Sequence, residues 1–215
     1  MRLLCYITDR LQFSGNEHEK RRQVLHRIAA CAAAGVHYIQ LREKDLNTRD
    51  LQELGAEAAR LVLQNTGARL LINSRIDVAL ACGASGVHLP ANDLPASEAR
   101  AIFSRAGHAS PVVSVACHTA EEVASAEAHG ADFAVFGPVF EKNGQRNHPG
   151  LELLERACQR PHMAANAMPV FALGGITLEN AVRCRDAGAA GIAAIRLFQQ
   201  NDVEDVMRKL RQSFE

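Results

Sequence analysis

One pattern occurs four times along the chain, at intervals of 48, 47 and 58 residues, and it constrains the fold more than any other feature. In each copy an alanine-containing segment ends at a glycine, and a short apolar run follows the glycine. The four glycines are Gly35, Gly83, Gly130 and Gly188. A glycine at this place is typical of a helix C-cap. A short apolar run is typical of a strand buried on both faces. The pattern therefore predicts helix–strand units that follow one another along the chain.

A further apolar run lies in each interval between the copies, and another precedes the first helix. These runs are Leu70–Asn73, Val112–Ala116, Val170–Leu173 and Leu3–Ile7. Strands that alternate with helices predict a parallel sheet with right-handed crossovers. Eight such units, each of about 24 residues, favour a single α/β domain over residues 1–215 with the (β/α)8 TIM-barrel fold. A doubly wound sheet is the alternative that the same alternation allows.

Helix boundaries follow from apolar periodicity and from capping residues. Thr48, Thr119 and Thr177 are expected N-caps. The long segment 137–150, which contains glycine and asparagine, is typical of a functional lid, and a disordered loop is the alternative. Helices are expected over 18–34, 48–66, 75–82, 95–105, 119–129, 150–160, 177–187 and 202–213.

Composition excludes several classes of function. The 24 basic residues equal the 24 acidic ones, so no basic surface favours nucleic acid. No apolar run is long enough for a membrane span, and the N-terminal run is too short for a signal peptide. The six cysteines are scattered without C-x-x-C spacing, which favours reduced thiols and a cytoplasmic protein. We expect a small-molecule substrate, no nucleic-acid or membrane partner, and leave a homo-oligomer open.

Two adjacent strand ends near the C-terminus predict a phosphate site. Gly174 and Gly175 follow the seventh strand, and Ile195 and Arg196 end the eighth. Glycine allows the backbone to approach a ligand closely. In a (β/α)8 barrel, the loops after strands seven and eight frequently bind phosphate. The alternative is a pair of glycine-containing turns without a ligand.

The end of the second strand carries the richest set of polar side chains. Gln40, Arg42 and Lys44 alternate, so a continuing strand directs all three to one side. A guanidinium, an ammonium and an amide together suit an anion. Asn73 ends the third strand and is expected to join this set. The alternative is a solvated charged loop with weak salt bridges.

Further candidates follow the fourth and fifth strands. His118 comes just before the Thr119 cap and is a candidate general acid–base, or else a histidine that orders the next helix. His88 lies within a strand and is expected to be structural. Asp93 is a candidate Mg²⁺ ligand or an N-cap. Cys117 is expected to pack in the core.

Strings distributed over nearly the whole chain resemble the thiamine phosphate synthase and thiazole tautomerase superfamily. They include Tyr6-Ile7-Thr8-Asp9, Gln40-Leu41-Arg42-Glu43-Lys44, Gly137-Pro138-Val139-Phe140 and Ala172-x-Gly174-Gly175-Ile176-Thr177-x-x-Asn180. The resemblance implies a (β/α)8 barrel that handles thiazole phosphate in vitamin B1 synthesis. In the synthase branch, the thiazole nitrogen displaces pyrophosphate from a pyrimidine pyrophosphate with the help of Mg²⁺. In the tautomerase branch, a proton is moved without a metal and the thiazole becomes aromatic.

The chain departs from the synthase pattern at several positions. Ser74 stands where the synthase has a metal-binding Asp, and Arg196 replaces a Ser of the last phosphate loop. We therefore expect a tautomerase-like enzyme with His118 as the catalytic residue. The alternative is a thiamine phosphate synthase with Mg²⁺ on Asp93. A non-catalytic regulator that binds thiazole phosphate is an alternative from another class.

Overall fold

The computed structural model describes residues 3–64, 67–140, 150–159 and 167–214. Eight parallel strands follow one another in chain order and close into a barrel. Closure is direct, because Leu4 pairs with Ile192 on one side of the first strand and Tyr6 pairs with Ile39 on the other. The expected (β/α)8 barrel is confirmed and the doubly wound sheet is wrong. The strands are β1 (Leu3–Ile7), β2 (Tyr38–Leu41), β3 (Arg69–Asn73), β4 (Gly86–Leu89), β5 (Val112–Cys117), β6 (Phe133–Phe136), β7 (Val170–Leu173) and β8 (Gly191–Ala194).

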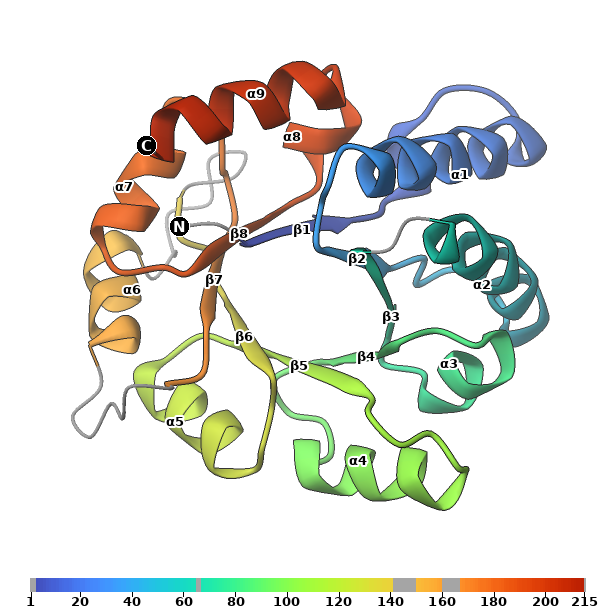
Figure 1. Cartoon of the computed structure of the whole chain (residues 1–215), viewed down its shortest axis with the longest axis horizontal. Coiled ribbons are helices and arrows are strands. Elements are labelled where there is room, and N and C mark those ends of the chain that lie inside the picture. Colours follow the sequence, from blue (N-terminus) through green and yellow to red (C-terminus); the bar gives the residue numbers. More distant parts are fainter. Residues whose placement is uncertain (1–2, 65–66, 141–149, 160–166, 215) are drawn as a thin grey trace.

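A ring of helices surrounds the strands (Figure 1). None of the helices in the described ranges is long and apolar enough to cross a membrane. The sequence did not reveal two short elements, η1 after β1 and α8 after β8. The helices are η1 (Arg10–Gln12), α1 (Glu17–Ala33), α2 (Thr48–Leu63), α3 (Ile76–Cys82), α4 (Ala96–Arg105), α5 (Ala120–Ala128), α6 (Gly150–Cys158), α7 (Ala181–Asp186), α8 (Arg196–Gln199) and α9 (Val203–Phe214).

Of the three expected threonine N-caps, one is confirmed. The Thr119 side chain accepts a hydrogen bond from the Glu122 amide at the start of α5. Thr48 is the first residue of α2, and the side chain of Asn47 caps the helix instead. Thr177 lies four residues before α7, in a turn that uses its backbone oxygen. Asparagine caps as well as threonine does, and the residue type alone does not decide between neighbours.

Side chains alternate between two separate apolar cores. One set packs between the strands and the helices. The other set fills the barrel interior, where Tyr38, Phe133 and Phe171 form an aromatic group with ring centroids 4.5 and 4.6 Å apart for the pairs that involve Phe133. Tyr38 and Phe133 are the first residues of β2 and β6, so these rings close the barrel at the amino ends of its strands. A ligand site inside the barrel is therefore left with the carboxyl ends.

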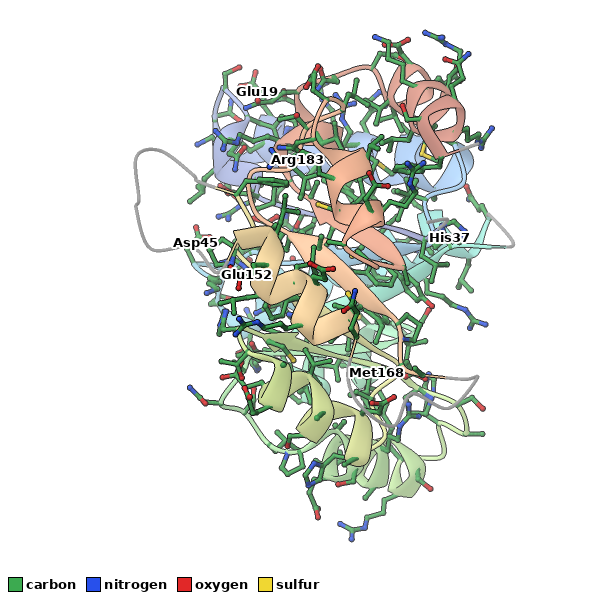
Figure 2. All side chains as sticks on the ribbon, turned by 90° about the vertical axis from the view of Figure 1, so that its left-hand side faces the viewer. Glu19, His37, Asp45, Glu152, Met168 and Arg183 are labelled. Atoms are coloured by element: carbon green, nitrogen blue, oxygen red, sulfur yellow. The ribbon has the colours of Figure 1, made fainter. Side chains whose placement is uncertain are left out.

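Figure 2 shows the barrel from the side and locates its two ends. His37, which precedes β2, and Asp45, which follows it, lie at opposite ends of the view. The candidate residues listed from the sequence all follow strands or end them, so they belong to the end that carries Asp45.

Candidate active site at the carboxyl ends of the strands

Polar side chains replace the apolar ones in the last inward-facing layer of β2 to β5. Gln40 donates to Asn73 Oδ1 from its Nε2, at 2.9 Å. His88 Nδ1 and Ser114 Oγ lie 2.9 Å apart, and both side chains are buried. The register pairs Asn73 with His88 and His88 with Ser114. Four adjacent strands therefore present a continuous polar row at the mouth of the barrel.

Gln40 has an unused hydrogen-bonding atom in this row. Its side chain is buried, and its Oε1 has no hydrogen-bond partner among the described residues. A buried acceptor without a partner costs about 1–3 kcal/mol. An N–H from a ligand would satisfy this oxygen.

Arg42 lies close enough to this row to act on its titration. Burial and, to a smaller extent, the positive charge of Arg42 lower the pKa of His88 to about 4. His88 is therefore neutral at physiological pH, and its expected structural role agrees with its hydrogen bond to Ser114. Lys44 is exposed beyond Arg42. We call Gln40, Arg42 and Lys44 the β2 arm of the site.

Two acidic residues, Glu43 and Asp45, alternate with the residues of the β2 arm, and Arg10 forms hydrogen bonds to both. Arg10 donates to both oxygens of Asp45, at 2.6 and 2.8 Å, and to Glu43 Oε2 at 3.3 Å. Burial raises the pKa of Glu43, while bonds from Thr8 and Arg10 act against that increase. The Arg10 guanidinium lowers the pKa of Asp45. The salt bridges of this loop therefore leave Arg42 and Lys44 unengaged within the described residues.

Neither Arg10 nor Glu43 was among the candidates from the sequence. The available signal was weak. It consisted of Glu43, two residues after the end of a buried strand, and Arg10, directly after Thr8-Asp9. Their partnership spans 33 residues and depends on β1 and β2 being neighbours.

The second group of candidates lies at the ends of β7 and β8. Gly174 and Gly175 have φ of 103° and 62°, in the region that favours glycine. The Gly174 backbone lies so close to the loop after β6 that an added Cβ would be 2.6 Å from Cα and Cβ of Pro138. Phe140 N donates to Gly174 O at 3.1 Å. The glycine pair is therefore required by the backbone, independently of any ligand.

The end of β8 leads directly into the short helix α8. Ile195 is its N-cap residue and is half-buried, whereas the side chain of Arg196 is exposed. The first amides of a helix have no partner within it and attract anions. We call Gly174, Gly175, Ile195 and Arg196 the β7–β8 arm. The expected phosphate site there stays a prediction.

His118 follows β5 and is exposed. Its Nδ1 lies 2.5 Å from the carbonyl oxygen of Gly137. A carbonyl can only accept, so Nδ1 carries the proton and Nε2 is left as the acceptor in the neutral ring. The backbone amide of His118 donates to Glu122 in α5. Within the described residues, the ring therefore has a structural bond at Nδ1 and no hydrogen-bond partner at Nε2.

The metal ligands expected for the synthase alternative are sparse. Asp93 is exposed, and its Oδ1 accepts from the amide of Leu94 at 2.8 Å. Ser74, with φ of 62°, accepts from the side chain of Asn73. The described ranges contain no group of three or more His, Cys, Asp or Glu residues arranged to hold a metal. One carboxylate suits only a Mg²⁺ that also uses oxygens of a substrate.

Two remaining expectations concern thiols and the lid. Cys117 is buried, as expected, and so are the other five cysteines. Residues 141–149 of the expected lid lie outside the described residues; the part that is described, 137–140, contacts β7 through the bonds of Val139 and Phe140.

A (β/α)8 barrel with polar and glycine-rich loops at the carboxyl ends of its strands has the architecture of the (β/α)8-barrel enzymes, whose active sites lie at that end. Residues 7–198 match the model of a family described as thiamine monophosphate synthase. The chain belongs to this family.

Relatives and solved structures agree with the family match. A Geobacter sulfurreducens protein, provisionally named as a thiamine-phosphate synthase, is 42% identical over 89% of this chain and 84% of its own length. The thiamine-phosphate synthase of Syntrophomonas wolfei is 34% identical over 99% of this chain and 96% of its own. The structure of thiamine phosphate pyrophosphorylase from Pyrococcus furiosus matches with a TM-score of 0.78 and 29% identity, covering 98% and 94% of the two chains.

Proposed function

We propose that this protein acts in thiamine biosynthesis and joins a pyrimidine diphosphate to a thiazole phosphate. The observation that carries the proposal is the presence of two candidate anion-binding arms, the β2 arm and the β7–β8 arm, on either side of β1. A reaction between two phosphorylated substrates needs two anion sites, whereas proton transfer within one thiazole phosphate needs one. The names of the relatives favour the same activity. The synthase alternative thereby replaces the tautomerase as our principal interpretation.

The side chains of the β2 arm suit the diphosphate substrate. In the proposed reaction the thiazole nitrogen forms a bond to the pyrimidine methylene carbon, and the carbon–oxygen bond to diphosphate breaks with its electron pair. Arg42 and Lys44 would hold the leaving diphosphate, since a guanidinium and an ammonium stabilise its growing charge. Gln40 would accept an N–H of the aromatic substrate at its unpartnered Oε1. The β7–β8 arm would hold the thiazole phosphate.

Magnesium fits this site only together with the diphosphate. Asp93 would supply the protein carboxylate, and Mg²⁺ bound there would neutralise charge on the leaving group. Ser74 cannot supply a second carboxylate. We therefore expect Mg²⁺ to bind weakly in the absence of the diphosphate.

The proposal is tested by incubating the purified protein with pyrimidine diphosphate, thiazole phosphate and Mg²⁺, with thiamine phosphate as the measured product. We expect product, and we expect Arg42→Met to raise the KM for the diphosphate about 10–100-fold, because a charge-assisted hydrogen bond contributes about 1.5–3 kcal/mol. Arg49→Met, which removes an exposed arginine of α2, is the matched control. Absence of thiamine phosphate from the wild-type reaction would contradict the proposal.

A tautomerase is the second candidate, and the Nε2 of His118, which has no partner among the described residues, favours it. A single imidazole can remove a proton from one position of the thiazole and return it to another. On this hypothesis His118→Gln lowers the tautomerase rate about 10²–10⁴-fold and keeps the melting temperature. If the histidine only ties β5 to the Gly137 loop, the melting temperature falls and the rate per folded molecule stays. Binding of thiazole phosphate without either activity would instead indicate a regulator.

A further inference from the structure

The segment Thr8–Gln12, between β1 and α1, is bonded to the β2 arm and to the last residue of α8, the short helix that begins at Arg196 of the β7–β8 arm. It contributes no residue to either arm. Its backbone and side chains nevertheless make hydrogen bonds to the loop after β2 on one side and to α8 on the other. We call this segment the β1 tie.

Toward the β2 arm, the β1 tie is bonded through backbone and side chain. Thr8 N donates to Gln40 O at 3.0 Å, and Arg42 N donates to Thr8 Oγ1 at 3.0 Å. The Thr8 hydroxyl in turn donates to Glu43 Oε1 at 2.5 Å. The amide of Arg10 also donates to Glu43, at 3.0 Å. Thr8, Arg10 and Glu43 are all buried, so these bonds are shielded from water.

Toward the β7–β8 arm, the β1 tie is bonded by a single buried side chain. Gln199, the last residue of α8, accepts from Asp9 N at 2.9 Å and donates to Asp9 O at 3.0 Å. Its amide thus pairs with the backbone of Asp9 in both directions, across 190 residues of sequence. Gln199 is 5% exposed.

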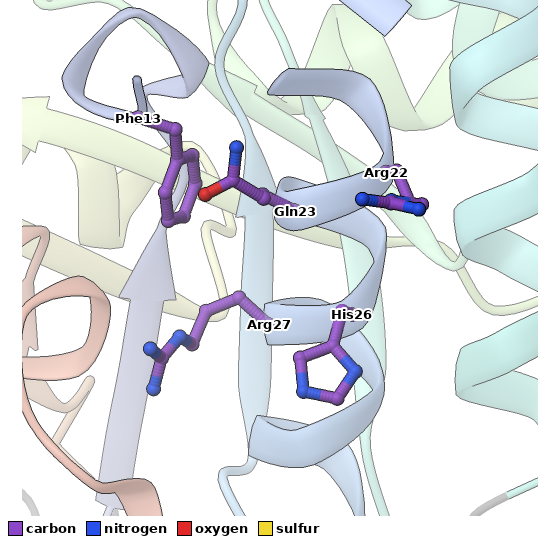
Figure 3. Close-up of a pocket in the computed structure, with 5 residues that line it drawn as sticks. All are labelled: Phe13, Arg22, Gln23, His26 and Arg27. Atoms are coloured by element: carbon purple, nitrogen blue, oxygen red, sulfur yellow. The ribbon is translucent and has the colours of Figure 1, made fainter. Parts of the chain in front are cut away.

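Arg27 holds the same end of α8 from outside the barrel. Its guanidinium donates to Gln199 O at 3.1 Å and to Asn201 O at 2.7 Å. In Figure 3, the Arg27 side chain extends from α1 toward the side on which Phe13 lies. Both residues line a pocket beside α1. α8 is therefore fixed both to the β1 tie and to α1.

We propose that Gln199 is a positioning residue for the joining reaction, acting through the β1 tie. Each arm holds one substrate, and the two reacting atoms meet only if the arms keep a fixed separation. A misplacement of about 1 Å can cost about 100-fold in rate even when each substrate still binds. The inference rests on the proposed function, and it assigns to Gln199 a contribution to turnover without contact with either substrate.

The test separates binding from turnover in Gln199→Leu, which removes both bonds to Asp9 and replaces the amide with an apolar side chain of similar size. We expect kcat to fall about 10–100-fold. We expect the Kd of inorganic pyrophosphate and the Kd of thiazole phosphate, each measured alone by calorimetry, to stay within about threefold, since each arm is intact. Arg27→Met is a second variant with a smaller expected loss of kcat, because it leaves the Gln199 amide in place.

Arg100→Met is the matched control. Arg100 also bonds backbone carbonyls of distant loops, those of Gly130 and Pro111, but these loops precede strands and lie at the opposite end of the barrel. We expect its kcat to be unchanged.

Three results would overturn the inference. Unchanged kcat in Gln199→Leu refutes it and leaves the proposed function standing. A loss of kcat with equal losses in both affinities shows general damage to the fold and also refutes it. Wild-type protein that binds both probes without turnover, or binds neither, refutes the proposed function and this inference with it.

Discussion

Replacing Gly174 with alanine should separate backbone strain from crowding at the β7–β8 arm. The residue has φ of 103°, and an added Cβ would lie 2.6 Å from two atoms of Pro138 and 3.1 Å from Val139 N. A left-handed conformation costs a non-glycine residue about 1–2 kcal/mol. Crowding against backbone and a proline ring, which cannot swing aside, adds about 1–3 kcal/mol. We expect Gly174→Ala to lower the free energy of unfolding by about 2–5 kcal/mol.

Gly83→Ala is the matched control for this substitution. Gly83 also has positive φ, 70°, but nothing lies within 4 Å of an added Cβ. We expect it to lose only about 1–2 kcal/mol. The free energies are measured by urea denaturation, and the affinity for thiazole phosphate by calorimetry. Equal losses of stability in the two variants would refute the reasoning about Pro138. An unchanged affinity in Gly174→Ala would place the thiazole phosphate elsewhere.

Three further predictions concern single side chains. The pKa of His88 is about 4 in the folded protein and near 6.5 when unfolded, so the unfolded state binds more protons between these values and stability falls as pH decreases through this window. Urea denaturation at pH 7 and 4.5 should show a loss roughly 2–3 kcal/mol larger for wild type than for His88→Gln; equal losses would contradict the assignment. Arg196→Ala should weaken thiazole phosphate binding by about 1–3 kcal/mol in calorimetry, and an unchanged Kd would show that its exposed charge is not used. Tyr6→Phe should leave the melting temperature unchanged or raise it, because the buried Tyr6 hydroxyl has no hydrogen-bond partner within the described ranges; a clear decrease would reveal a partner.

The comparison of β2 with its loop shows how far sequence patterns reach into the site. Alternation predicts that Gln40 and Arg42 face away from Glu43, because successive side chains of an extended chain point to opposite sides. It does not reveal what the other side contacts. Glu43 is buried against Arg10, and only the neighbouring position of β1 brings these two charges together.

Several features were determined by the sequence itself. The glycine before each of four strands, the apolar runs and the Thr119 cap act over a few residues, so the barrel, most helix boundaries and the strand ends that carry candidate residues follow from local chemistry. The N-cap Asn47 was missed, because adjacent polar residues compete for the same cap, and the start of α7 at Ala181 was placed four residues too early.

Tertiary structure alone decided the contacts that join the two arms. Gln199 meets Asp9 because β8 closes the barrel against β1, which places the last short helix beside the first loop. Among the described residues, Oε1 of Gln40 is buried without a hydrogen-bond partner, and His88 is buried. Both properties likewise depend on neighbours contributed by other strands. Local sequence specifies which residues can make such bonds. The partner of each is set by closure of the sheet, since it brings together groups that lie far apart along the chain.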